Sequence, residues 1–215
     1  MPSVMLKVFP REVSLTVWVW NLLYRINRSC TLVSDLKNFV VCLLENAGSF
    51  NLPFVGEAHA ASCDTSQLTA LDQLCHVCTA NHIANRANTR QGRALVDTAS
   101  KVFGYDDVCS LKSTLKHFHY PVVFGAVYGS LGLDLDTTLT AFMSGVIRTS
   151  VASAVRLDRI GPIEAQKIVT ELQRLIPEII HRNKTSSAAD ARVTFPLTDI
   201  MQNCHDKLFS KLFYS

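Results

Sequence analysis

The stretch LCHVCTANHIAN, residues 74–85, gathers two thiols and two imidazoles within a few turns of chain. Cys75, Cys78 and His82 are spaced by three and four residues, and His76 lies between them. Thiolate and imidazole are preferred ligands of zinc, and a CxxC pair can also do redox chemistry. The residue types alone therefore suggest a metal centre or a dithiol centre.

The same spacing fits the core-facing stripe of an amphipathic helix that starts at Leu68 and continues through Cys75, Cys78 and His82. Free cysteine behaves as a small buried hydrophobe. A structural zinc site usually needs four ligands, and a redox CxxC normally opens a helix instead of lying inside one. We therefore interpret the cluster as the buried side of a helix over residues 65–85 and predict no metal ligand. A thiol-based metal-binding or redox protein centred on Cys75 and Cys78 is the alternative.

Other signatures of catalysis are absent from the sequence. It has no phosphate-binding loop, G-x-S-x-G, H-E-x-x-H or dinucleotide fingerprint, and its acidic residues are dispersed. His117 and His119 alternate in HFHYP and could bind a metal or transfer protons, but no Cys, Asp or Glu neighbours them. A role at a helix start or an interface is favoured for both. We predict a protein that is not an enzyme.

Composition limits the partners and the compartment. The chain has 215 residues, 48% hydrophobic and 18% charged, with a formal charge of +3, which is typical of a folded protein and not of a nucleic-acid binder. Its seven cysteines are scattered and odd in number, which favours free thiols in the cytoplasm. The apolar run Val13–Tyr24 is too short to span a membrane, so no membrane partner is expected.

Helical periodicity dominates beyond the first residues and predicts an all-α fold, a single bundle of about six to eight helices. Expected helix ends are Gly48, Thr65 or Ser66, Gly104, Pro121, Gly132, Asp134 or Asp136, and the pair Gly161–Pro162. Residues 183–195 are polar and small, which predicts a flexible linker. We divide the chain into an N-terminal segment (1–33), a helical domain (34–182), this linker (183–195) and a C-terminal tail (196–215).

Two segments resemble a known family. They are HFHYPVVFGAVYGSLGLD with the helices after it, and the terminal PLTDIMQNCHDKLFSKLFYS. In order and spacing they are similar to the urease accessory protein UreF, especially its plant and fungal branch. The resemblance covers residues 34–215. Residues 1–33 lack the family's LPTGGFAHSGGLE-like segment, so the N-terminus is expected to be divergent or truncated.

The resemblance implies an all-α, homodimeric, non-catalytic protein of the cytoplasm. Such a protein bridges the accessory protein UreD or UreH and the GTPase UreG on apo-urease, and couples GTP hydrolysis to nickel insertion. Nickel would be handled in transit by the complex, with no cofactor bound tightly. A generic helical adaptor unrelated to urease is a further alternative.

The resemblance also implies roles for individual residues. Lys211 stands where the family commonly has Arg and would be the cation of the tail that contacts the GTPase. The matching positions of the tail, expected to bind partners, are Pro196, Asp199, His205, Lys211, Leu212, Phe213 and Ser215. The matching positions of the domain, expected in the helix core or an interface, are His119, Pro121, Gly125, Arg156 and Gly161.

Overall fold

The computed structural model describes residues 33–202, and every regular element in that range is helical, so the predicted all-α fold is confirmed. The elements are α3 (Val33–Asn46), a π-helical turn η1 (Ala47–Asn51), α4 (Leu52–Ala60), α5 (Thr65–Cys78), α6 (His82–Phe103), α7 (Asp106–Thr114), α8 (Tyr120–Ser130), α9 (Leu135–Arg156), α10 (Pro162–Gln173), α11 (Ile176–Asn183), a 3₁₀ turn η2 (Ala188–Asp190) and α12 (Pro196–Gln202).

The helix ends follow from local sequence. The Asp64 carboxylate accepts hydrogen bonds from the backbone N–H groups of Ser66 and Gln67, so Asp64 caps α5 in place of the predicted Thr65 or Ser66. Asp134 caps α9, and it was one of the two residues predicted for this role. Gly104 ends α6 with φ +66°, a left-handed conformation that favours glycine. Short polar side chains and glycine therefore fix where the helices begin and end.

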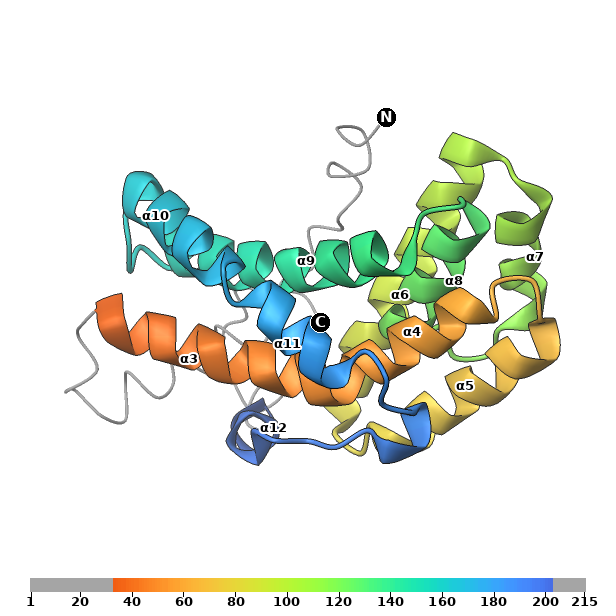
Figure 1. The fold of residues 1–215 in the computed structure, drawn as a ribbon, viewed down its shortest axis with the longest axis horizontal. Helices are drawn as coiled ribbons and strands as arrows, with labels where there is room; N and C mark the ends of the chain where they lie inside the picture. The colour runs from red at the N-terminus through yellow and green to blue at the C-terminus, as the bar shows by residue number, and fades with distance from the viewer. Residues whose placement is uncertain (1–32, 203–215) are drawn as a thin grey trace.

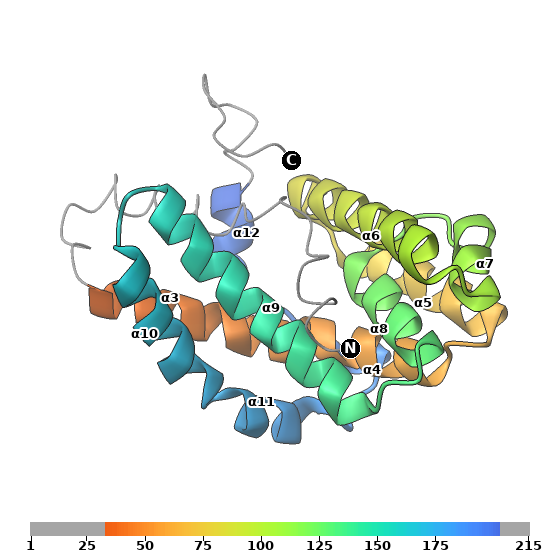
Figure 2. The same cartoon turned by 90° about the horizontal axis from the view of Figure 1, so that it is seen from above.

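One long helix runs through the molecule and the others pack on its two halves. The elements α3, η1 and α4 form a continuous helix from Val33 to Ala60, so the helix end predicted at Gly48 is wrong. Its first half lies beside α9, α10 and α11, and its second half lies beside α5 and α8, with α6 packed on the far side of α8 (Figures 1 and 2). A single buried core, which includes Phe54, Phe124 and Met143, joins the two halves.

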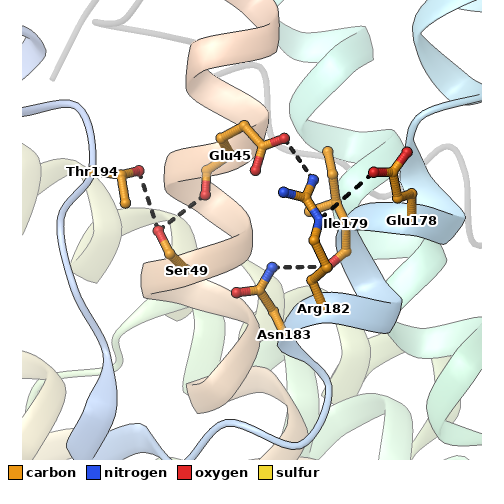
Figure 3. A network of polar contacts seen from close by, with 7 residues as sticks. All are labelled: Glu45, Ser49, Glu178, Ile179, Arg182, Asn183 and Thr194. Carbon is orange, nitrogen blue, oxygen red and sulfur yellow. Dashed lines mark hydrogen bonds and ion pairs between the residues drawn. The ribbon is translucent and has the colours of Figure 1, made fainter.

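The π-helical turn is where the C-terminal part of the described chain attaches. The turn is buried, and a Cβ on Gly48 would lie 2.5 Å from the Ile179 side chain of α11. The backbone N–H of Arg192 donates to the carbonyl of Ser49, and the Ser49 hydroxyl lies 3.2 Å from the Thr194 hydroxyl (Figure 3). A π turn shifts the hydrogen-bond register, which leaves acceptors for such contacts.

The segment predicted as a flexible linker, residues 183–195, is held against this turn. The Asn46 carboxamide oxygen accepts hydrogen bonds from the N–H groups of Thr194 and Phe195, at 2.8 and 3.1 Å. The Phe195 ring meets Phe39 edge to face, with 5.9 Å between ring centroids. Mobility of the segment stays a prediction, but these contacts fix the direction in which it leads to α12.

Two helices in the described part of the chain have the length and hydropathy of membrane spans, Val33–Ala60 and α9. Of their most apolar windows, 67% and 50% of the residues are buried inside the fold. Core helices of a bundle are apolar because neighbouring helices cover them. Burial therefore accounts for both.

Among the described helices, α8 and α4 make the most extensive contact, and this contact depends on glycine. A Cβ on Gly125 would lie 2.3 Å from the carbonyl oxygen of Val55 and 2.9 Å from the backbone nitrogen of His59. A Cβ on Gly129 would likewise meet the His59 carbonyl at 2.7 Å. Backbone atoms cannot move aside as side-chain ends can, so α8 lies this close to α4 only without side chains at these positions.

We expect Gly125→Ala to lower the free energy of unfolding by about 1–3 kcal/mol, because the added methyl group forces two backbones apart. Gly56→Ala is the matched control. Gly56 lies inside α4, and a Cβ there would meet nothing within 4 Å. Replacing such a helical glycine by alanine is expected to be neutral or to stabilise by up to about 1 kcal/mol. Urea denaturation followed by circular dichroism measures both, and equal effects would contradict the close-packing role.

Candidate functional site

The thiol cluster is divided between two helices. The α5 helix ends at Cys78, and the Asn81 side chain, which accepts from the N–H groups of Ile83 and Ala84, starts α6. Cys75 is fully buried, whereas Cys78 and His82 are exposed. The predicted continuous helix over residues 65–85 is therefore wrong, because the cap signal at Asn81 interrupts it. The buried interpretation holds for Cys75 and is wrong for Cys78 and His82.

The environment of Cys75 is unsuited to thiolate chemistry. Burial raises its pKa to about 12, although the Thr79 side chain, hydrogen-bonded to it, lowers the pKa in part. A protonated thiol is neither a good nucleophile nor a metal ligand. Within residues 33–202 no group of three His, Cys, Asp or Glu side chains is arranged to hold a metal ion.

A different polar cluster forms where α5 meets the loop before α8. His76 and His117 are stacked with 3.7 Å between ring centroids. The Nδ1 atom of His76 lies 3.2 Å from Nε2 of His119 and 3.2 Å from the amide nitrogen of Asn85. With the amide donating to Nδ1, that atom is an acceptor, and His119 donates to it through Nε2–H. The Nδ1 atom of His119 then has no hydrogen-bond partner, although it is buried.

Asp72 holds the loop that carries two of these imidazoles. Its carboxylate accepts hydrogen bonds from three successive backbone N–H groups, those of His117, Phe118 and His119, at 2.7, 3.2 and 2.9 Å. Phe118 has φ +66°, which is unusual for a bulky residue. The carboxylate therefore stabilises a strained loop and fixes the start of α8.

The other side of this loop is closed by α6. A Cβ on Gly92 would lie 1.9 Å from the carbonyl oxygen of Phe118, so the two backbones are in direct contact. The guanidinium of Arg93 lies 5.2 Å from the centre of the Phe118 ring, within reach of a cation–π interaction. The loop is thus clamped between α5 and α6.

The cluster is electrostatically suited to neutral imidazoles. Burial lowers the pKa of His119 to about 4, against an opposing effect of Asp72 and with contributions from His76 and His117. Burial, followed by the neighbouring His76, also lowers the pKa of His117. At neutral pH the imidazoles of His117 and His119 are therefore neutral and take part in packing and hydrogen bonding.

Sequence reasoning missed Asp72 and His76, because they lie far from HFHYP along the chain. A signal was present in the sequence, since Asp72 lies four residues after Leu68 and three before Cys75, within the apolar stripe of α5. In the structure Asp72 is 1% exposed. Charged side chains are almost never buried so completely without partners. His119, predicted for a helix start, is the N-cap residue of α8 and is fully buried.

The five positions of the helical domain that the family resemblance singled out lie in two separate regions of the structure. His119, Pro121 and Gly125 lie at the start of α8 and on its contact with α4. Arg156 is exposed in the last turn of α9, and Gly161 caps α10. The corner between α9 and α10, to which these two residues belong, lies at the other end of the molecule from α8 (Figure 1). The structure does not bring the five into one site, and their assigned roles stay predictions.

Of the positions predicted in the C-terminal tail, two lie within the described residues and the others lie outside them. Pro196 and Asp199 belong to α12, while the predicted residues His205, Lys211, Leu212, Phe213 and Ser215 lie outside the described residues. The Asn81 amide donates to the backbone carbonyl of Asp199 at 3.1 Å and to the Gln202 side chain at 3.0 Å. One side chain therefore caps α6 and also holds α12, from which the tail departs. Burial raises the pKa of Asp199.

Comparisons with known proteins all point to the same family. A family model described as UreF matches residues 32–173. Urease accessory protein F of rice (Oryza sativa subsp. indica) is 34% identical over 187 residues, covering 83% of this chain and 70% of the rice protein. Urease accessory protein F of Arabidopsis thaliana is 32% identical over 189 residues, covering 84% and 78%. A UreF-like protein of Schizosaccharomyces pombe is 28% identical over 200 residues, covering 85% and 83%.

The imidazole cluster predicts a loss of stability in mild acid. The pKa of His119 is about 4 in the folded chain and about 6.5 unfolded, so the unfolded chain binds more protons between these values. The stabilisation is therefore present above pH 6.5 and is lost as pH falls toward 4. Between pH 7 and pH 5 the free energy of unfolding should drop by about 2 kcal/mol from this group.

Urea denaturation at the two pH values measures this slope. His119→Gln should flatten it, whereas His181→Gln, which removes an exposed imidazole of α11, should leave it unchanged. A wild-type slope that survives in His119→Gln would assign the acid sensitivity to another group.

Asn81 offers a test of how α12 is held. Asn81→Asp keeps an oxygen that can cap α6 but removes the amide that donates to α12, and Asn81→Ser does the same without added charge. We expect both to change global stability by less than about 1 kcal/mol and to speed amide hydrogen exchange in α12 but not in α6. Mass spectrometry of peptic peptides resolves the two regions, and unchanged exchange in α12 would contradict the role of Asn81.

Proposed function

Because this chain belongs to the UreF family of urease accessory proteins, we propose that it acts as a non-catalytic scaffold in the complex that matures urease. It bridges a UreD- or UreH-type protein and a UreG-type GTPase on apo-urease, and couples GTP hydrolysis to nickel insertion. The observation that carries the proposal is the similarity to relatives named urease accessory protein F over most of the chain.

The geometry of the described residues is compatible with a scaffold. The imidazoles of His76 and His119 are hydrogen-bonded to each other, and Asp72 holds the loop before α8, so these polar groups serve the fold. The Cys75 thiol is kept protonated by burial. No observation favours the thiol-based metal or redox interpretation, and none favours a generic adaptor over a member of this family. We propose that nickel passes through the assembled complex and is not bound tightly by this chain.

The C-terminal tail is the proposed contact for the GTPase. It leaves the body at α12, which Asn81 holds against the start of α6. On α12 the apolar side chains Leu197 and Ile200 are exposed, at 42% and 65%, and could contribute to a docking surface. A tail fixed at its base loses less conformational entropy on binding than one that is free over its whole length.

Homodimerisation and a cytoplasmic location belong to the proposal as well. Free thiols support the location, since the cysteines within the described residues, Cys42, Cys63, Cys75, Cys78 and Cys109, form no disulfide. Reduced cysteines are the rule in reducing compartments.

Co-purification tests the scaffold role. The full chain is expected to recover the GTPase only together with the UreD- or UreH-type protein, and to restore nickel-dependent urease activity in a reconstituted system. Failure to bind either protein would reject the proposal.

Metal analysis of the purified chain distinguishes the proposal from the thiol-based alternative, because a stoichiometric metal lost in Cys75→Ser/Cys78→Ser would favour that alternative.

Lys211→Ala tests the tail contact. We expect GTPase recovery to fall about tenfold, since a charge-assisted contact contributes roughly 1.5–3 kcal/mol. Lys101→Ala is the matched control, an exposed lysine on α6, and should recover the wild-type amount. Equal recovery by both variants would remove Lys211 from the interface.

A further inference from the structure

The outer face of α10 is an unpartnered apolar surface. Ile163 is 76% exposed, the highest value for a large apolar side chain in the described part of the chain. It borders an open depression of about 580 Å³. The described residues that line the depression are Pro162, Ile163, Gln166, Lys167, Thr170 and Glu171.

This face differs from the face that α10 turns to the core. Ala165, Ile168 and Leu172 are buried on the inner side, so core packing is satisfied without Ile163. Long side chains such as Gln166 and Lys167 line the depression beside Ile163, and their aliphatic stems add to its apolar surface. Such a surface suits a few large apolar side chains but is too small for a standard protein–protein interface.

The chain itself contains a segment of matching chemistry. Val13–Tyr24, VSLTVWVWNLLY, is strongly apolar and includes both tryptophans of the protein, Trp18 and Trp20. A run of this kind is unfavourable in water and gains free energy by contact with another apolar surface.

The segment is followed in the chain by α3, which lies beside this surface. The α3 residue Lys37 forms an ion pair of 2.5 Å with Glu171, which itself lines the depression. The beginnings of α3 and α10 lie at the same end of the molecule in both overall views (Figures 1 and 2). The residues between Tyr24 and Val33 can span up to about 28 Å when extended. A short tether raises the effective concentration of the segment at the surface.

We propose that Val13–Tyr24 docks within the same chain on the outer face of α10, with a tryptophan side chain seated against Ile163. Docking covers the exposed apolar surface of α10 and stabilises the segment by the same contact. The proposal concerns packing within the chain and does not depend on the role in urease maturation.

Tryptophan fluorescence of the full chain is a direct test, because both tryptophans lie in the segment. In wild type we expect blue-shifted emission and weak quenching by acrylamide. Ile163→Asp places a carboxylate in the contact, should lower the docking equilibrium about tenfold or more, and should therefore shift emission to the red and raise quenching. Val102→Asp is the matched control, since Val102 is a 51% exposed apolar residue of α6, and it should match wild type.

Photo-cross-linking locates the contact. A benzoylphenylalanine placed at position 163 should cross-link to peptides of residues 13–24, and the same probe at position 102 should not. Far-ultraviolet circular dichroism shows that each variant is folded. Solvent-exposed tryptophans in wild type, or shielding that Ile163→Asp leaves intact, would overturn the proposal. Shielding or cross-linking that disappears on dilution would show a second copy as the occupant and would overturn docking within one chain.

Discussion

The long helix from Val33 to Ala60 can be the centre of this fold only if its backbone is approached closely from two sides. On one side α8 lies against α4. There Gly125 and Gly129 have no side chains, which leaves room for backbone carbonyl groups of α4. On the other side α11 lies against the π turn, where Gly48 leaves room for Ile179. Because the contact between α8 and α4 joins two backbones, it cannot adjust as a side-chain contact can, and it therefore determines where the neighbouring helices lie.

The π turn links this packing to the C-terminal segment. It displaces the helical hydrogen-bond register just where the N–H groups of Arg192, Thr194 and Phe195 arrive, and Asn46 and Ser49 accept their hydrogen bonds. Asn81 then holds α12 at the start of α6. The chain thus reaches the predicted partner-binding tail by a path that is fixed at several points.

Much of the fold could be predicted from local sequence. Helical periodicity, a helix end at Gly104, the Gly161–Pro162 start and the cap at Asp134, one of two alternatives left open, were confirmed, because each depends on residues within one or two turns. The break at residues 79–81 was missed although Asn81 carried the signal, because the apolar period of α5 runs in phase into α6. The thiol stripe was consequently extended to two residues that are exposed.

The amino-acid sequence by itself determined the all-α class, most helix ends and the resemblance to a urease accessory family, since periodicity, capping and motif order are properties of the linear chain. Only the tertiary structure decided that Asp72 and His76 meet His117 and His119, and that Asn81 both caps a helix and holds α12. These contacts join residues more than forty positions apart. Their partners are set by the packing of helices, which no local pattern encodes.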